Sequence, residues 1–253
     1  MLSIQNLAIG YAQHQLASSI SFTLEAGEAI AVLGPNGCGK TTLFRTLLGL
    51  LPRLQGEIQL DTRSISDLSA AEIARNIAYV PQVSSSFFNF NVIDVVAMAR
   101  TPHLAWYALP GVTDRKIAAS ALAELGMADF AERPFDELSG GERQLVLIAR
   151  ALAAEAPIIL LDEPTASLDF GNQFLILDEI AKLTARGRAV LFTTHNPDHA
   201  LRIAERTLAM SRSGHIDCGA TAAILNSKSL TALYGIDVQL MPGPNGPITT
   251  VGK

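Results

Sequence analysis

The sequence predicts an α/β protein with a mostly parallel sheet. Three apolar runs, Ala29–Leu33, Ile158–Leu161 and Ala189–Thr194, have the length of central parallel strands, and glycine or polar side chains follow each run. Segments with helical patterning separate the runs, so strands and helices alternate along the chain. Hydrophobic residues make up 49% of the 253 positions, enough for one large core or a compact pair of domains.

Most of the first sixty residues are predicted to form strands. Residues 19–24 alternate serine or threonine with apolar side chains, as half-buried strands do, and residues 55–60 have the pattern of another exposed strand. After Lys40 the pattern becomes helical (TTLFRTLLGLL) until Pro52 ends the helix. A short strand is then predicted over Ile77–Val80.

The middle of the chain predicts an inserted helical subdomain over residues 84–156, which are Ala-rich and mostly helical in pattern. The other lobe would comprise about residues 1–83 and 157–240, with a helix over 174–184 as the crossover between the last two apolar strands. Residues 241–253 are rich in proline and glycine, which predicts an irregular tail.

Charge and hydropathy limit the classes of function. Nineteen basic and twenty-four acidic residues give a net charge of −5, which argues against a nucleic-acid partner bound by bulk charge. The sequence has no run of about 18 apolar residues and no secretory signal pattern at its start, so the chain is expected in the cytosol. Two distant cysteines, Cys38 and Cys218, indicate a reducing compartment.

A phosphate-binding loop follows the first apolar strand. Residues 34–41 (GPNGCGKT) fit G-x-x-x-x-G-K-[ST] between a strand and a helix, where glycines let backbone N–H groups and the helix N-terminus face an anion. Lys40 adds charge beside the β- and γ-phosphates, and the Thr41 hydroxyl is a ligand for Mg²⁺. An ordinary glycine-rich turn is the alternative. The predicted nucleotide-binding residues are Gly34, Pro35, Asn36, Gly37, Cys38, Gly39, Lys40, Thr41 and Thr42.

Two adjacent carboxylates end the second apolar strand, at the edge of a parallel sheet that faces the ligand crevice. Asp162 is predicted to hold the Mg²⁺ shell, and Glu163 is predicted to orient and deprotonate the attacking water. A charged strand end that is simply hydrated is the alternative reading. The two acids together with the phosphate loop predict ATP hydrolysis.

Two further polar side chains follow strands to the same edge. His195 ends the third apolar strand and is predicted to hydrogen-bond the γ-phosphate, while Gln82 follows the strand Ile77–Val80 and is predicted to contact Mg²⁺ or the water. A metal site at His195 and His199 is the alternative. The turn at Pro197 disfavours it, since the two histidines do not share one helix face.

A second glycine motif, LSGGE at residues 138–142, precedes a helical run. Ser139 and Glu142 form a capping box, so part of the motif is a good helix start. Gly140 and Gly141 cost backbone entropy and are not needed for capping, which predicts a close approach to a phosphate. Because this chain already has one phosphate loop, the second phosphate would belong to a partner copy.

At this point the chain resembles the ATP-binding subunits of ABC transporters from about residue 2 to 240. LSGGERQ matches the family signature and ILLDEP the Walker B strand. Gln82 matches the Q-loop, Asp169 the D-loop and His195 the switch histidine. Tyr11 lies where the family has an adenine-stacking aromatic residue, with an ordinary strand aromatic as the alternative.

The resemblance implies a P-loop NTPase core with a mostly parallel sheet, an antiparallel β subdomain and an inserted α-helical subdomain. It also implies a head-to-tail homodimer that sandwiches two ATP molecules with Mg²⁺. Closure of the dimer would drive integral membrane permease subunits, with a secreted or periplasmic substrate-binding protein involved indirectly. The implied location is the cytoplasmic face of the inner (plasma) membrane, as a peripheral protein.

The runs NVIDVVAMARTPH and LYGIDV are similar to importers of iron–siderophore, haem, cobalamin or molybdate, although Ala99 replaces a glycine usual in that branch. VPQVSSSFFNF is similar to the molybdate/tungstate member. Its aromatic residues, Phe87, Phe88 and Phe90, are predicted to form a groove for a helix of the permease beside Gln82, with core packing as the alternative.

Two other classes of protein remain as alternatives. A non-transport ABC ATPase would act on DNA or in translation, but the stretch between Lys40 and Ser139 is too short for the long coiled coils of chromosome proteins. Zinc cysteines and a second ATPase unit are also missing from the sequence. A binding module without turnover would lack the catalytic acid, whereas Glu163 is present.

Overall fold

The computed structural model describes the whole chain except residues 13, 83–89, 106, 244–245 and 253. The chain divides into two compact units. The first contains Met1–Leu68 and Ile180–Lys253, and the second contains Ser69–Glu179. The predicted boundaries of the helical subdomain, 84–156, fall inside the second unit and remain a prediction.

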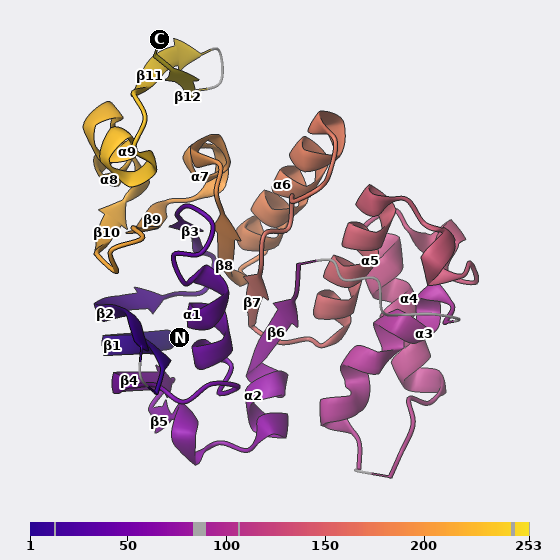
Figure 1. The fold of residues 1–253 in the computed structure, drawn as a ribbon. Coiled ribbons are helices and arrows are strands. Elements are labelled where there is room, and N and C mark those ends of the chain that lie inside the picture. Colours follow the sequence, from indigo (N-terminus) through magenta and orange to yellow (C-terminus); the bar gives the residue numbers. More distant parts are fainter. Residues whose placement is uncertain (13, 83–89, 106, 244–245, 253) are drawn as a thin grey trace. The chain divides into compact units, whose positions relative to one another are not determined.

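An antiparallel sheet is built from the start of the first unit, in the strand order β2-β1-β4-β5 (Figure 1). Ile20, Phe22 and Leu24 are buried in β2, so the alternation in the sequence marks a half-buried strand, as predicted. A 3₁₀ turn follows the sheet. The bounds are β1 (Leu2–Tyr11), β2 (His14–Leu24), β4 (Gln55–Leu60), β5 (Arg63–Ser64) and η1 (Ile65–Asp67).

The parallel part of the first unit surrounds β3 (Ala29–Leu33), whose five residues are all buried. It pairs in parallel with β8 (Ala189–Thr194) on one side and with β9 on the other. Full burial on both faces explains why β3 and β8 are continuous apolar runs in the sequence. The remaining elements are α1 (Lys40–Leu47), α7 (Pro197–Ile203), β9 (Arg206–Met210) and β10 (Ile216–Ala220), with β10 antiparallel to β9.

The C-terminal part of the first unit forms α8 (Thr221–Ile224), α9 (Ser227–Tyr234) and a hairpin of β11 (Val238–Gly243) and β12 (Gly246–Val251). The prediction of an irregular tail over 241–253 was therefore wrong. Pro242 pairs with Pro247 and Gly243 with Gly246 next to the hairpin turn.

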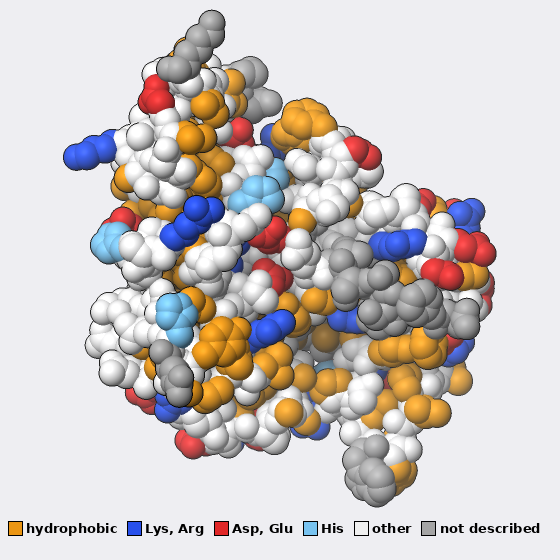
Figure 2. Space-filling view, viewed as in Figure 1, with side chains coloured by type: hydrophobic (Ala, Val, Ile, Leu, Met, Phe, Trp, Pro, Cys, Tyr) orange, Lys and Arg blue, Asp and Glu red, His pale blue; other side chains and the backbone are white. Residues whose placement is uncertain are grey.

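Apolar side chains lie at the surface over α9 and the hairpin, as Figure 2 shows. Met241 and Ile248 pair across the hairpin and are 47% and 45% exposed. This explains the missed strands, since Val238 is the one buried residue among the described residues of these two strands, and one is too few to produce the apolar alternation of a half-buried strand.

The second unit contains the parallel pair β6 (Ile77–Val80) and β7 (Ile158–Leu161) and a group of helices in which α3, α4 and α5 pack against one another. Its helices are α2 (Ala70–Asn76), α3 (Val92–Ala97), η2 (Met98–His103), α4 (Val112–Glu124), η3 (Ala128–Phe130), η4 (Phe135–Glu137), α5 (Gly140–Ala153) and α6 (Phe170–Ala185), of which α6 continues into the first unit.

Arg100 joins the helices of the second unit. Its buried guanidinium donates to the backbone oxygen of Ala153 at 2.8 Å and to the carboxylate of Glu155 at 2.6 Å, and it pairs with Asp114 at 3.4 Å. Ala99 lies in η2 and is not among the residues with positive φ, so alanine is accommodated there without backbone strain.

Parallel strands, an antiparallel sheet and a helical group confirm the predicted fold class. The strands Gln55–Leu60 and Ile77–Val80 have the predicted bounds, while α6 begins at Phe170, one turn before the predicted start. Within the described residues, none of the helices has both the length and the apolar character that a membrane span requires.

Candidate nucleotide-binding site

The phosphate loop connects β3 to α1 in the first unit. Gly34 begins the loop and donates its N–H to the backbone oxygen of Thr194 at 3.3 Å. A Cβ atom at Gly34 would lie 2.3 Å from the backbone oxygen of Met210 and 2.7 Å from Cys38 Sγ, so only glycine fits. Glycine at this position therefore lets the loop start close to β9.

Two glycines of the loop have a backbone conformation that other residues rarely adopt, and there is open space beside Gly37. Gly37 and Gly39 have φ angles of 83° and 106°, in the left-handed region that favours glycine. A Cβ atom at Gly37 would meet nothing within 4 Å. Gly39 precedes α1, whose N-terminal N–H groups attract anions. The loop therefore fits the phosphate chain of a nucleotide.

Lys40 places a positive charge within this loop. The side chain is only 5% exposed, and Nζ donates to the backbone oxygens of Gly34 at 2.8 Å and Pro35 at 3.4 Å. Buried charge interacts strongly with an incoming anion, since little water screens it. Next to Lys40, Thr41 is exposed and Thr42 is buried, so the Thr41 hydroxyl is the one open to a bound ligand.

The loop after β8 carries the predicted switch histidine, His195, which is exposed. Its backbone oxygen accepts a hydrogen bond of 2.7 Å from Tyr234 Oη. His199, four residues later on α7, is buried. Its Nδ1 lies 3.2 Å from Thr194 Oγ1 and its Nε2 lies 3.2 Å from Asn196 Nδ2. Both ring nitrogens of His199 thus have protein partners, and within the described residues no group of three or more His, Cys, Asp or Glu side chains is arranged to hold a metal ion.

Acidification is expected to destabilise the protein through His199. Burial, with a smaller contribution from His195, lowers the pKa of His199 from 6.5 to about 4, although Asp198 opposes the shift. The folded state thus holds the neutral ring while the unfolded chain binds a proton near pH 6.5. Above pH 6.5 the neutral ring makes its full contribution to the free energy of unfolding. As the pH falls from 6.5 towards 4, the free energy of unfolding decreases by about 2–3 kcal/mol.

Thermal melting between pH 7.5 and 4 checks this expectation. The His199→Asn variant, which cannot titrate in that range, should lose less melting temperature than the wild-type chain over the same interval. Equal losses in the two proteins would show that another group is responsible.

In the second unit, β7 delivers Asp162 and Glu163. Asp162 is 2% exposed, donates its N–H to the backbone oxygen of Val80 at 2.9 Å, and accepts from Tyr79 Oη at 3.3 Å. Glu163 has a φ angle of 46°, which is rare for a residue with a side chain. Such a conformation costs about 1–3 kcal/mol and is concentrated at functional sites. The backbone strain falls on the residue predicted to act as the base.

The second glycine motif begins α5 in the second unit. Ser139 caps the helix and forms the predicted capping box with Glu142, and hydrogen bonds from Ser139 lower the pKa of Glu142. A Cβ atom at Gly141 would lie 2.7 Å from the side chain of Asn172, which would have to shift to admit it. At Gly140 a Cβ atom would lie 3.4 Å from Leu168 Cδ2, an ordinary contact.

Asn172 also binds the predicted D-loop residue. Asp169 Oδ1 accepts from the N–H of Asn172 at 2.9 Å, and Oδ2 accepts from its side-chain Nδ2 at 2.8 Å. These bonds lower the pKa of Asp169, which stays ionised. Asn172 therefore contacts both Gly141 of the signature motif and Asp169 of the D-loop. No motif in the sequence predicted this role of Asn172.

Three further predicted residues, Tyr11, Gln82 and Phe90, lie at the surface. Tyr11 is 50% exposed at the end of β1 in the first unit, and Gln82 is exposed after β6 in the second. Phe90 is 46% exposed, whereas Phe87 and Phe88 lie outside the described residues. Tyr79 and Tyr234, which contact predicted site residues, were not predicted, since neither belongs to a phosphate-binding motif.

The fold and the phosphate loop together define a P-loop nucleotide-binding protein. Residues 17–166 match the family model described as ABC transporter. The chain is 41% identical to the molybdate import ATP-binding protein MolC of Haemophilus influenzae, over 92% of this chain and 87% of that protein. It is 33% identical to the iron(3+)-hydroxamate import ATP-binding protein FhuC of Bacillus subtilis, over 98% of this chain and 93% of that protein.

Solved structures agree with this grouping. A transporter assigned to the metal-chelate type of ABC transporters, in an inward-facing conformation, has a TM-score of 0.86 and 38% identity over 99% of this chain and 96% of that chain. A dimeric bacterial ABC transporter cassette has a TM-score of 0.74 and 27% identity over 87% of this chain and 99% of that chain.

The chain belongs to the ABC transporter family. It is an ATP-binding subunit whose ATPase activity is coupled to transport, as its motifs predicted. The roles of the individual site residues are proposals, which follow.

Proposed function

We propose that this chain is the ATP-hydrolysing subunit of an importer for a metal chelate or an oxyanion, such as an iron–siderophore, haem, cobalamin, or molybdate or tungstate. The observation that carries the proposal is its similarity, over nearly the whole chain, to import subunits for molybdate and iron(3+)-hydroxamate. The predicted branch motifs agree with it. The alternative roles on DNA or in translation have no comparable support.

Some of the predicted site residues bind ATP, and others take part in its hydrolysis. Lys40 and the backbone N–H groups of residues 36–42 bind the phosphates, and Gly34 and Pro35 form the start of that loop. Tyr11 stacks on the adenine ring. Glu163 takes the proton of the attacking water, and His195 donates a hydrogen bond to the γ-phosphate oxygens. Preorganised donors of this kind stabilise the charge that develops in the transition state.

Thr41, Gln82 and Asp162 are proposed to hold Mg²⁺. The donor set is suited to this ion, which prefers hard oxygen ligands such as a hydroxyl, an amide oxygen and a carboxylate. Burial of Asp162, at 2% exposure, favours binding of a cation there, because a buried carboxylate gains from a counter-charge. Bound Mg²⁺ would neutralise charge on the β- and γ-phosphates.

The proposed working unit is a head-to-tail homodimer with a separate integral membrane permease, at the cytoplasmic face of the inner (plasma) membrane. Each ATP would lie between one copy's phosphate loop and Ser139, Gly140, Gly141 and Asp169 of the other copy. The permease would dock near Gln82 and Phe90, together with Phe87 and Phe88. A secreted or periplasmic binding protein would deliver the cargo to the permease.

Uptake by cells that lack the gene tests this proposal. We expect loss of ATP-dependent accumulation of one of three labelled probes, namely ⁹⁹Mo-molybdate, a ⁵⁵Fe-hydroxamate siderophore or ⁵⁷Co-cobalamin. The wild-type gene should restore that uptake and the Lys40→Ala gene should not. Normal uptake of all three probes, and also of ⁵⁵Fe-labelled haem, by the deletion strain would contradict the importer assignment.

A further inference from the structure

The run LYGIDV contains a tyrosine that contacts the loop after β8. Tyr234 Oη donates to the backbone oxygen of His195 at 2.7 Å, the usual length of an O–H···O hydrogen bond. Burial raises the pKa of Tyr234, with the Cys38 thiol contributing, so the phenol keeps the proton that it donates. The bond joins positions 39 residues apart, at the residue proposed to contact the γ-phosphate.

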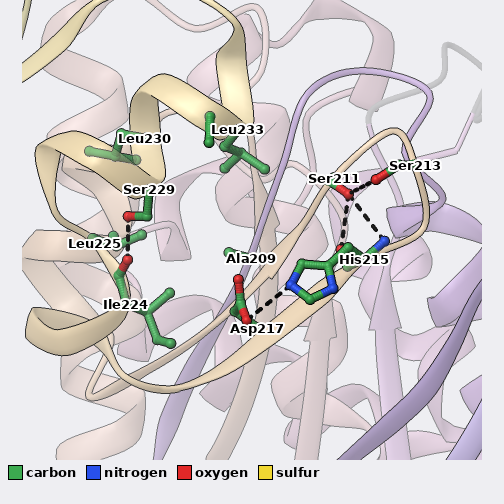
Figure 3. A pocket seen from close by; sticks show the side chains of 11 residues that line it. Ala209, Ser211, Ser213, His215, Asp217, Ile224, Leu225, Ser229, Leu230 and Leu233 are labelled. Atoms are coloured by element: carbon green, nitrogen blue, oxygen red, sulfur yellow. Dashed lines mark hydrogen bonds and ion pairs between the residues drawn. The ribbon is translucent and has the colours of Figure 1, made fainter.

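The helix that carries Tyr234 is fixed at its start, its end and one face. Asn226 caps the start of α9 with a hydrogen bond of 3.0 Å to an N–H of the first turn, and Gly235 ends the helix with a φ of 71°. Leu230 is fully buried. A pocket of about 340 Å³ lies beside this helix, and Leu230 and Leu233 are among the residues that line it. Figure 3 shows both side chains on α9, facing the β9–β10 hairpin. Tyr234 is thus presented from a defined position.

The hairpin after α9 is bound to the same helix by two side chains. The N–H of Val238 donates to Thr231 Oγ1 at 3.0 Å, and the N–H of Leu240 donates to Ser227 Oγ at 3.0 Å. Val238 is 5% exposed, so the first strand of the hairpin is also anchored by packing. Helix and hairpin therefore form one C-terminal segment, residues 227–252.

This C-terminal segment holds the loop after β8 at a second point. The N–H of Thr249 in β12 donates to Asp198 Oδ1 at 2.8 Å. Asp198 lies in the first turn of α7, and its own N–H donates to Asn196 Oδ1 at 3.0 Å. Tyr234 thus donates to His195, just before the turn at Asn196 and Pro197, and Thr249 donates to Asp198, just after it.

We propose that Tyr234 is a positioning residue for His195, so that the C-terminal segment sets the orientation of the switch-histidine loop and the rate of ATP turnover depends on it. The inference rests on the proposed role of His195. Because Tyr234 acts through the backbone of His195, its loss should lower kcat while leaving the KM for ATP nearly unchanged.

The Tyr234→Phe variant of the full chain removes only the hydroxyl group. We expect kcat for phosphate release at saturating MgATP to fall about threefold to tenfold, with KM changed by less than about twofold. Tyr107→Phe is the matched control, since Tyr107 is 75% exposed in the second unit and should show wild-type kinetics. An unchanged kcat, or a loss expressed mainly in KM, would overturn the proposal.

A spectroscopic measurement tests the same contact without turnover. In protein labelled with ¹³C-histidine, the Cε1–H signal of His195, assigned by its absence from His195→Gln, should shift in Tyr234→Phe. The signal of His103, which lies in the second unit, should stay in place and serve as the internal control. An unshifted His195 signal in the folded variant would overturn the proposal, whatever the kinetics.

His195→Ala separates this inference from the function it rests on. Normal hydrolysis by His195→Ala would refute the proposed role of His195. A large loss in His195→Ala together with normal kinetics in Tyr234→Phe would refute only the positioning role of Tyr234.

Discussion

Replacing Glu163 by glutamine is expected to reduce ATP hydrolysis by at least about 100-fold while ATP binding is retained. Glutamine has the size of glutamate but cannot accept the proton of the attacking water, and general-base catalysis contributes about 10²–10⁴ to a rate. The positive φ of 46° affects both side chains alike, so the exchange isolates the carboxylate. With hydrolysis blocked, the variant should accumulate as an ATP-bound dimer.

Phosphate release and light scattering after size exclusion with MgATP measure the two effects. Glu124→Gln, at the exposed end of α4, is the matched control and should behave as the wild-type chain. Turnover by Glu163→Gln near the wild-type rate would assign the base to another residue.

Replacing Lys40 by alanine should weaken ATP binding about tenfold or more and remove detectable turnover. Hydrogen bonds to charged groups contribute about 1.5–3 kcal/mol, which corresponds to about 10- to 150-fold in affinity. Lys40 as a residue is 5% exposed, so its charge is little screened by water.

Titration with a fluorescent ATP analogue measures this affinity. Lys116→Ala removes an exposed lysine from α4 and should bind the analogue as the wild-type chain does. Since Lys40 Nζ also bonds the loop carbonyl oxygens, the melting temperature of the apo-protein is measured alongside. Wild-type affinity in a folded Lys40→Ala protein would show that the loop does not bind the phosphates.

The parts of the fold that could be predicted are those whose signal is local in the sequence. β3, β7 and β8 are buried on both faces, which requires continuous apolar runs. The phosphate loop is equally local, since its glycines, its lysine and the following helix are adjacent. By contrast, the hairpin β11–β12 has exposed apolar residues. It depends on strand pairing and on the hydrogen bond between Thr249 and Asp198, and the spacing of apolar residues in the sequence indicates neither.

The parts of the site that escaped prediction depend on contacts between distant residues. The contact between Gly141 and Asn172 is one of them, since a Cβ atom at Gly141 would lie 2.7 Å from the Asn172 side chain. Tyr79 contacts Asp162 from another strand, and Tyr234 contacts His195 from the C-terminal segment. Each contact is set by tertiary packing, which the patterns of a single sequence do not encode.

The proposed sharing of the ATP site between two copies of the chain is tested most directly by cross-linking. The variant carries Asn36→Cys in the phosphate loop and Ser139→Cys in the signature, with both native cysteines replaced by serine. A short bifunctional maleimide should then produce a covalent dimer when MgATP is present. Either single-cysteine variant should stay monomeric on a denaturing gel. A double variant that binds ATP yet gives no covalent dimer would contradict the shared site.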